Sequence, residues 1–534
     1  MASAATIQHP TLGTVQGKAA DDGSGVTQFL GVKYASLKDR FAPPELIKGD
    51  PAGAVDAKEF GPHVVCLPGA IDMEMSYIQQ TLPKPANPPV TSDTEGLNLN
   101  ITVPPAGTPK PASGFPVLAF IHGGGLFIGA NWWPQYDFKR LVKFGAETGR
   151  PFIGVNIGYR LGIPGFLTSA EMRQAGYKAN NGLRDQATAL QWIKHHIAGF
   201  GGDPANVTAM GESAGGASAL AHLQSPTPLF TRIISMAGTP LMMQPLPPPV
   251  ADHAYALVTA AFGLADLAPP ARLAALRTLP VRDLLAKAPP GAPLLLVEDG
   301  DAVRATPSHA RLAPALAPGA GGWCAEILAG WCGADANILT HMIPALRSGE
   351  VARVFTASFE RSLAERPGVA GRLFEAYGIR AEAEAKGALP RIVALASDLL
   401  FRASARAYVD GWPEGRKAWL YDFEVRNPWE GEWQGYATHI LDVAALFLNF
   451  EEKLPSEGFR ERTREWAGEV LDFVVGQGAG WDAEREVRVF KEDGHGTVTR
   501  EKEIGDDKLS TVVKETGVGF DVFVGAWANF MQGK

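Results

Sequence analysis

A serine between two glycines is the first residue in this sequence with clear potential for chemistry. Gly211-Glu212-Ser213-Ala214-Gly215 fits the pattern G-x-S-x-G, which places a serine on a sharp turn between a strand and a helix. Residues 207–210 have strand character, and the Ala- and Leu-rich run after the motif is typical of a helix. A Cβ at either flanking glycine is expected to collide with a neighbouring strand or helix. A chance match is easy in a chain with 60 glycines, but this context favours a nucleophile.

Backbone N–H groups at two places could stabilise negative charge beside this serine. Ala214 directly follows Ser213 at the expected helix start, where its N–H can help to bind an oxyanion. Residues 122–125 read His-Gly-Gly-Gly and follow the apolar run 117–121. Consecutive glycines allow N–H groups to point at one spot without obstruction by side chains. A structural turn is the alternative, but the position after a predicted central strand favours an oxyanion hole.

A serine hydroxyl needs a base, and the base needs an acid that fixes its tautomer. With a G-x-S-x-G nucleophile, the acid and then the histidine follow the serine along the chain. Of three distant histidines, His495 lies in a charged hairpin tip and is predicted to face solvent. His341 lies only six residues beyond the best acid candidate, too close for a separate strand and loop. His439 follows the predicted strand 418–425 and a loop, and opens an apolar helix, so it is the predicted base.

Asp335 is the favoured acid, with three other carboxylates as alternatives. It follows the apolar run 327–329 and therefore lies just past the carboxyl end of a predicted strand. A lone aspartate in that position is commonly a turn or cap residue. Glu326 begins the same strand, at the wrong end, and Asp301 lies in an Asp-Gly-Asp turn. Asp398 lies in an apolar helical run and could support the site from behind.

The elements that must position these residues alternate between strands and helices. Continuous apolar runs predict central strands covered on both faces, and apolar residues at spacings of three and four predict a helix over 183–197. This rhythm predicts an α/β fold with a doubly wound sheet. Around it we expect further elements: a small antiparallel sheet within 11–60, a long surface loop over 67–96, a mainly helical, cap-like segment over 240–410, and a hairpin over 487–498 that turns at Asp493-Gly494.

Composition limits the remaining classes of function. The 534 residues show no linker, repeat or charge block, and 46% are hydrophobic, so we expect one large domain. The net charge of −8 argues against a nucleic-acid partner, and no apolar run approaches the ~18 residues of a membrane span. The N-terminus lacks the pattern of a secretory signal. The chain has three cysteines, an odd number that is not typical of a secreted protein held together by disulfides. We therefore predict a cytoplasmic protein without a disulfide.

Metal and nucleotide cofactors find no support in the sequence. His195 and His196 are adjacent on a predicted helix, so their side chains diverge, and no Cys or His cluster has zinc spacing. No G-x-G-x-x-G follows an early strand. The expected chemistry therefore needs no cofactor.

Taken together, the motifs resemble those of the type-B carboxylesterase family, which includes the cholinesterases and large fungal lipases. The resemblance runs almost end to end, and its most specific pieces are residues 29–35, 40–44, 97–100 and the long block 180–216. It implies an α/β-hydrolase fold, with Ser213 as nucleophile, His439 as base and the acid at Asp335, five residues after Gly330. It also implies an oxyanion hole formed by the N–H groups of Gly124, Gly125 and Ala214.

The sequence departs from the family pattern at three places. Asp335 stands where the family normally has glutamate, one methylene longer. Gly96 replaces the cysteine of the Ser-Glu-Asp-Cys-Leu motif, which leaves Cys66 without its usual partner. Residues 236–238 read Met-Ala-Gly instead of Gln-Ser-Gly, so a hydroxyl behind the nucleophile is missing.

By resemblance the chain is expected to cleave carboxylic esters of small molecules or lipids through an acyl-enzyme. Glu212 is expected either to place negative charge near the imidazolium or to act as a simple salt-bridge partner, and Glu212, Leu126 and Phe127 are predicted to contact substrate. A non-catalytic adhesion or binding module is the alternative, because some family members keep the fold and lose the serine. The intact serine, histidine and acid favour the enzyme. The sequence assigns no particular ester, no oligomeric state and no lid role to the 67–95 loop.

Overall fold

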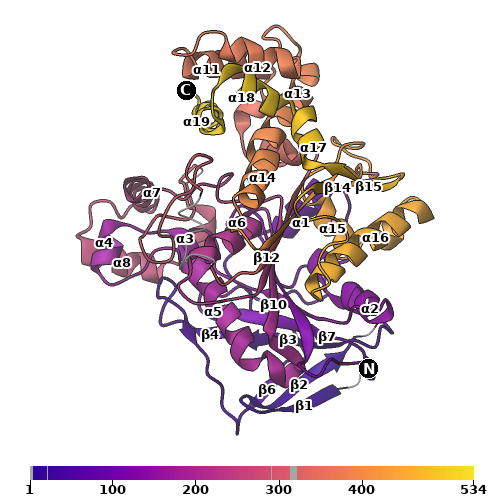
Figure 1. Cartoon of the computed structure of the whole chain (residues 1–534). Helices are drawn as coiled ribbons and strands as arrows, with labels where there is room; N and C mark the ends of the chain where they lie inside the picture. The colour runs from indigo at the N-terminus through magenta and orange to yellow at the C-terminus, as the bar shows by residue number, and fades with distance from the viewer. Residues whose placement is uncertain (1–3, 21, 290, 313–321) are drawn as a thin grey trace.

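The computed structural model describes residues 4–20, 22–289, 291–312 and 322–534. Its centre is a mixed 13-stranded sheet in the order β1-β2-β3-β7-β9-β8-β10-β11-β12-β13-β14-β15, with β6 paired to β2 (Figure 1). A separate sheet contains β4 and β5. The strand bounds are β1 Ala4–His9, β2 Gly13–Ala19, β3 Thr27–Lys33, β4 Ala35–Ser36, β5 Glu45–Leu46, β6 Ala54–Asp56, β7 Asn98–Val103, β8 Phe115–Ile121, β9 Ile153–Ile157, β10 Gly202–Glu212, β11 Arg232–Met236, β12 Glu326–Cys332, β13 Lys417–Phe423, β14 Glu486–Lys491 and β15 Gly494–Thr499.

Helices flank this sheet and build the upper part of the molecule in Figure 1. The α-helices are α1 Ala70–Ile78, α2 Lys139–Glu147, α3 Gly162–Phe166, α4 Ala170–Gln174, α5 Asn181–His196, α6 Ala214–Ala221, α7 Pro248–Ala261, α8 Pro269–Thr278, α9 Val281–Ala286, α11 Val351–Ser362, α12 Val369–Tyr377, α13 Ala385–Ser397, α14 Ala403–Asp410, α15 Leu441–Leu446, α16 Glu457–Val474, α17 Arg500–Asp506, α18 Lys508–Thr516 and α19 Phe520–Met531. Shorter helical turns are η1 Pro134–Tyr136, η2 Ile197–Phe200, η3 His222–Gln224, η4 Asp335–His341, η5 Pro344–Arg347, the π-helical η6 Asp398–Arg402 and η7 Glu451–Lys453. In the described part of the chain, no helix combines the length and apolarity that crossing a bilayer requires.

The central strands follow from their continuous apolar sequences. Every residue of β8 and β9 is buried, and the two strands pair in parallel. Parallel pairing continues through β8, β10, β11, β12, β13 and β14. A parallel sheet covered by helices on both faces requires such strands, so the predicted doubly wound α/β sheet is confirmed.

The N-terminal strands β1, β2 and β3 extend the main sheet. They pair antiparallel with one another, and β3 then pairs with β7, from Thr27↔Val103 to Lys33↔Asn98. Pairing with β7 satisfies backbone groups that a free edge would expose. The small antiparallel sheet expected within 11–60 is present as the short strands β4 and β5.

The 67–96 segment was wrongly expected to have no regular structure. It contains α1, whose apolar residues Ile71, Met75 and Ile78 are buried at spacings of four and three. Those spacings were visible in the sequence, but the Pro-rich and polar residues that follow obscured them. The helix also buries a carboxylate, Glu74.

Two later segments refine the expected elements. The two residues between β14 and β15 are Glu492 and Asp493, so the turn lies one residue earlier than expected and Gly494 begins β15. The segment 240–410 is mainly helical, as expected, but it also contains the strand β12. Helices α7 to α9 precede this strand along the chain, and helices α11 to α14 follow it. The C-terminal helices α18 and α19 pack on α12 and α11, and Figure 1 shows these four helices side by side.

A buried ion pair at Arg160 connects two of the specific sequence blocks, 40–44 and 180–216. Arg160, after β9, donates from Nε and Nη2 to the two oxygens of Asp185 in α5, at 2.8 and 2.7 Å. Its Nη1 also donates to the carbonyls of Arg40 and Ala42. A buried bidentate pair with its remaining donors satisfied fixes geometry strongly. It therefore holds the 40–44 segment against α5, the helix that precedes the nucleophile strand.

Candidate active site

Ser213 occupies a strained turn between β10 and α6. Its backbone has φ 52° and ψ −122°, a conformation that non-glycine residues rarely adopt, and its N–H donates to the carbonyl of Met236 at 2.8 Å. The side chain is half-buried at the end of the strand. Strain of this kind persists only where the surrounding structure enforces it, and it occurs preferentially at functional sites.

Close backbone packing enforces the turn, as the glycine pattern predicted. A Cβ on Gly211 would lie 2.2 Å from the carbonyl oxygen of Gly215, and one on Gly215 would lie 2.0 Å from the carbonyl oxygen of Ile121. On the far side, a Cβ on Gly238 would lie 1.8 Å from the carbonyl oxygen of Ser213. The Gly238 carbonyl accepts the hydroxyl of Ser235, so a hydroxyl is present behind the nucleophile although position 237 is alanine.

The glycine loop after β8 lies beside this turn. Ile121 pairs with Gly211 in the parallel β8–β10 ladder, which places residues 122–125 next to the Ser213 turn. Gly124 and Gly125 have φ of +90° and +64°. A Cβ on Gly124 would lie 2.2 Å from the carbonyl oxygen of Ile128, whereas one on Gly125 would meet only the Met342 Cε, at 3.7 Å. Gly125 therefore faces open space, as a substrate-binding backbone requires.

Ala214 begins α6 and is fully buried. The first N–H groups of a helix have no intrahelical acceptor, and the helix dipole makes this end favourable for an anion. The turn thus offers a backbone donor immediately after Ser213.

Asp335 and His439 form a direct, buried pair. Nδ1 of His439 lies 2.7 Å from Oδ1 of Asp335, and both side chains are almost completely inaccessible to solvent. The other Asp335 oxygen accepts the backbone N–H of Cys332 at 2.7 Å. The two loops are joined by a backbone bridge between Ala334 and Thr438. This carboxylate can fix the tautomer of the imidazole and stabilise its protonated form.

Glu212 lies on the other side of the same imidazole. Its Oε1 is 3.2 Å from Nε2 of His439, and neither oxygen of this buried side chain has a hydrogen-bond partner among the described residues. Burial opposes protonation of His439, but the hydrogen bond to Asp335 and the negative charges of Asp335 and Glu212 outweigh it and raise the pKa of the histidine to about 10. At this position the charge of Glu212 can stabilise an imidazolium.

No hydrogen bond joins the Ser213 hydroxyl to His439 in the described structure, where Nε2 faces Glu212 instead. Hydrogen bonds of this type are often long without substrate and tighten when substrate binds. The strained Ser213 turn and the Asp335–His439 pair are therefore both formed, whereas the hydrogen bond between Ser213 and His439 is not.

The other candidates from the sequence have different partners. Asp301 pairs with Lys178 and Arg184, Glu326 with Arg232, and Asp398 with Tyr377 and Arg402. The ring of His341 contacts the ring of Tyr77, with centroids 4.5 Å apart, and His495 pairs with Glu465. None of these contacts involves the His439 imidazole.

Three polar residues near His439 were missed by the sequence analysis. The Asn337 side-chain oxygen accepts the backbone N–H of His439 at 2.9 Å. Asp442, one turn beyond the histidine, accepts the Tyr421 hydroxyl at 2.7 Å, and burial raises its pKa to about 7. Glu74 of α1 accepts Gln135 at 2.9 Å, and burial raises its pKa to about 8. Their signal in the sequence was weak, because each lies within an apolar or irregular run.

Two predicted substrate contacts differ in accessibility. Leu126 is fully buried with φ +68°, and its carbonyl accepts the N–H of Gly162, whereas Phe127 is 36% exposed. Their substrate roles stay predictions.

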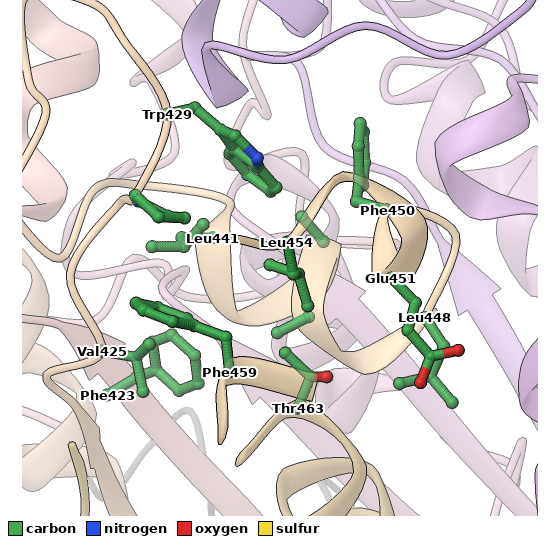
Figure 2. A pocket seen from close by; sticks show the side chains of 13 residues that line it. Phe423, Val425, Trp429, Leu441, Leu448, Phe450, Glu451, Leu454, Phe459 and Thr463 are labelled. Carbon is green, nitrogen blue, oxygen red and sulfur yellow. The ribbon is translucent and has the colours of Figure 1, made fainter. Parts of the chain in front are cut away.

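Figure 2 shows a separate small pocket whose side chains come from β13, α15, α16 and adjoining loops. Its lining is almost wholly apolar and includes neither Ser213, Asp335 nor His439, so it offers no catalytic group. The described residues also contain no cluster of three or more metal-ligating side chains.

Comparison with known proteins identifies the family and the fold of this chain. The sequence model of the carboxylesterase family matches residues 3–465 of this chain. Lipase 3 of Yarrowia lipolytica is 33% identical over 251 residues, which are 45% of this chain and 48% of the lipase. The para-nitrobenzyl esterase of Bacillus subtilis is 35% identical over 223 residues, 40% of each chain. Each alignment thus spans less than half of the curated relative.

Similarity among solved structures extends over nearly the whole chain. A thermophilic PNB esterase has a TM-score of 0.73 at 24% identity, covering 94% of this chain and 99% of its own. A second PNB esterase has a TM-score of 0.71 at 24% identity and covers 95% and 100%. At this identity the match establishes the fold.

Proposed function

Because this chain belongs to the carboxylesterase family, we propose that it hydrolyses carboxylic esters through an acyl-enzyme on Ser213. The observation that carries the proposal is the strained Ser213 turn on the same sheet edge as a buried Asp335–His439 pair. An elbow of this kind exposes a hydroxyl for attack, and a carboxylate–imidazole pair can remove its proton.

In the proposed reaction, the Ser213 oxygen attacks the ester carbonyl while Nε2 of His439 accepts the hydroxyl proton. The N–H groups of Gly124, Gly125 and Ala214 bind the negative oxygen of the tetrahedral intermediate. His439 then returns the proton to the leaving alcohol. Water attacks the acyl-serine by the same route, and the carboxylic acid leaves. Asp335 and Glu212 stabilise the imidazolium that forms in each half-reaction.

Small-molecule and lipid esters are both candidate substrates. The relatives include a lipase and a para-nitrobenzyl esterase. Two exposed apolar side chains lie beside the glycine loop and give it an apolar rim: Phe127 follows Gly125 by two residues, and the Met342 Cε lies 3.7 Å from a Cβ built on Gly125. Such a rim suits an ester with an apolar acyl or alcohol group. A series of p-nitrophenyl esters of increasing acyl length measures this preference.

Replacement of the nucleophile tests the proposal. Ser213→Ala should lower kcat by about 10⁶-fold, the scale observed when the nucleophile of such a set is removed. A fluorophosphonate probe should label the wild-type protein at Ser213 and leave the variant unlabelled. A folded Ser213→Ala protein with near-normal esterase activity would refute the role of the serine. An unlabelled wild-type protein without esterase activity would support the non-catalytic alternative.

A further inference from the structure

A π-helical turn behind the site takes no part in the reaction described above. It is η6, Asp398–Arg402, which interrupts the long helix formed by α13 and α14. Single π turns insert an extra residue into a helix, are destabilising, and occur frequently at functional sites. The apolar residues of the turn, Leu399, Leu400 and Phe401, are buried. Its contacts therefore indicate what this turn positions.

Two contacts connect this turn to the proposed acid–base pair. The Phe401 ring meets the His439 ring nearly edge to face, with centroids 5.4 Å apart and an interplanar angle of 63°. Ser397, directly before the turn, accepts the backbone N–H of Ala336 at 3.0 Å, next to Asp335. One short segment thus touches the base and the loop that carries the acid.

Ion pairs from the C-terminal helices hold the turn in place. Arg402 donates from Nε to Glu503 of α17 at 2.6 Å, and Arg406 of α14 donates to Asp507, the N-cap residue of α18, at 2.7 Å. Both carboxylates are buried. Asp398, at the start of the turn, accepts the Tyr377 hydroxyl at 2.6 Å. Glu503 and Asp507 lie outside the residues 3–465 matched by the family model.

The two carboxylate partners of Arg402 differ in distance, 2.6 Å for Glu503 and 3.4 Å for Asp398. Removal of the Glu503 charge would take away the closer partner, so the buried guanidinium would lose part of its charge compensation and be held less tightly. The guanidinium of Arg402 also lies 5.6 Å from the ring centre of Trp331, in the strand that leads to Asp335. Movement of Arg402 would therefore displace its neighbour Phe401 and disturb β12.

We propose that Phe401 is a positioning residue for the His439 imidazole, and that Glu503 of α17 holds Phe401 in place through Arg402. This inference rests on the proposed function of Ser213 and His439. The carboxylates of Asp335 and Glu212 contact the nitrogens of the imidazole, and the charges of Glu74 and Asp442 act on it from farther away. The edge-to-face contact between the two rings limits rotation of the imidazole, so Nε2 keeps an orientation from which it can accept the Ser213 proton once substrate binds.

Paired variants test the two links. Phe401→Leu should lower kcat by ~10- to 100-fold with KM within about twofold, because misplacement by ~1 Å costs a reaction about that much. Its matched control is Phe359→Leu, an equally buried ring of α11 that stacks on Phe355. The control should lose at least as much thermal stability and keep kcat within about twofold.

The second pair of variants tests the distant support. Glu503→Gln should lower kcat in the same direction as Phe401→Leu, again with little change in KM. Glu501→Gln, an exposed residue of the same helix, should leave kcat unchanged. Because Glu503→Gln keeps the size of the side chain, it tests the proposal even if Phe401→Leu does not fold.

The outcomes separate this inference from the proposed function. A folded Phe401→Leu protein with wild-type kcat, or an equal loss of kcat in Phe359→Leu, would overturn the positioning role of Phe401. A normal kcat in Glu503→Gln would overturn the proposed support of Phe401 by Glu503 of α17. If Ser213→Ala remains active, the proposed function fails instead. If the probe labels the wild-type protein at Ser213 and Phe401→Leu keeps the wild-type kcat, the proposed function stands and only this inference is refuted.

Discussion

The Asp335 side chain reaches His439 although it is one methylene shorter than the glutamate that the resemblance implies at this position. Backbone contacts explain the reach. The N–H of Ala334 donates to the carbonyl of Ala437 at 2.8 Å, so the acid-bearing loop lies directly against the base-bearing loop. The carboxylate then meets Nδ1 at 2.7 Å. The direct contact between these two loops lets the aspartate reach the imidazole.

Asp335→Asn tests the identity of the acid. The amide can stabilise the wrong histidine tautomer and carries no charge to stabilise the imidazolium, so kcat should fall by about 10⁴-fold. Glu326→Gln, at the opposite end of β12, should change kcat little because Glu326 pairs with Arg232. Steady-state kinetics of folded variants measure both. Retention of most activity by Asp335→Asn, with its loss in Asp398→Asn, would make Asp398 the acid.

The two carboxylates at His439 predict an unusual pH dependence. The base must be neutral, and its raised pKa keeps it protonated to higher pH, so kcat/KM should rise with pH from neutral into the alkaline range. Glu212→Gln removes one charge that favours the imidazolium. The pKa of His439 should then fall, and the acidic limb of the profile should move to lower pH. An acidic limb that stays in place or moves to higher pH would contradict this role of Glu212.

At the scale of elements, the nucleophile turn depends on the distance between α6 and β8. Gly215→Ala would place a Cβ 2.0 Å from the Ile121 carbonyl oxygen and would push the helix away from the strand that carries the glycine loop. Overpacking of this kind costs ~1–3 kcal/mol. We expect a lower Tm and a large loss of kcat, because Ser213 and the oxyanion donors separate.

Gly468→Ala in α16 is the matched control for the glycine substitution. No atom lies within 4 Å of its added Cβ, and alanine is favoured over glycine in a helix by ~0.5–1 kcal/mol. Its Tm should stay constant or rise, with unchanged kcat. Equal Tm and activity for Gly215→Ala and the wild-type protein would show that the turn tolerates a wider spacing.

At the scale of the whole molecule, we propose that none of the three cysteines forms a disulfide. Cys66, Cys324 and Cys332 are buried and unpaired in the structure. Burial raises the pKa of Cys66 to about 11 and that of Cys324 to about 12, so their reactive thiolates are scarce at neutral pH.

Thiol alkylation tests this proposal. The native protein should react slowly, and after unfolding without reductant all three cysteines should be alkylated, as measured by mass spectrometry. A cross-linked peptide that contains Cys66 would contradict the prediction.

Local sequence by itself determined the central strands of the main sheet and the turn that carries Ser213. Continuous apolar runs specify β8 and β9, because buried parallel strands need apolar residues on both faces. The Ser213 turn is equally local, since glycines within four residues of one another permit its close packing. The order of Ser213, Asp335 and His439 also followed from strand ends, together with a family resemblance.

Only the tertiary structure decided how the surroundings of His439 are completed. Glu212, expected near the imidazolium, reaches the ring from β10, whereas Phe401, which no sequence pattern placed there, reaches it from a π turn. Spacing in a sequence reports contacts within a helix or a strand, whereas these contacts depend on the packing of one element against another. The burial that raises the pKa values of Glu74 and Asp442 arises from the same packing. It is a property of the folded chain and of no single segment.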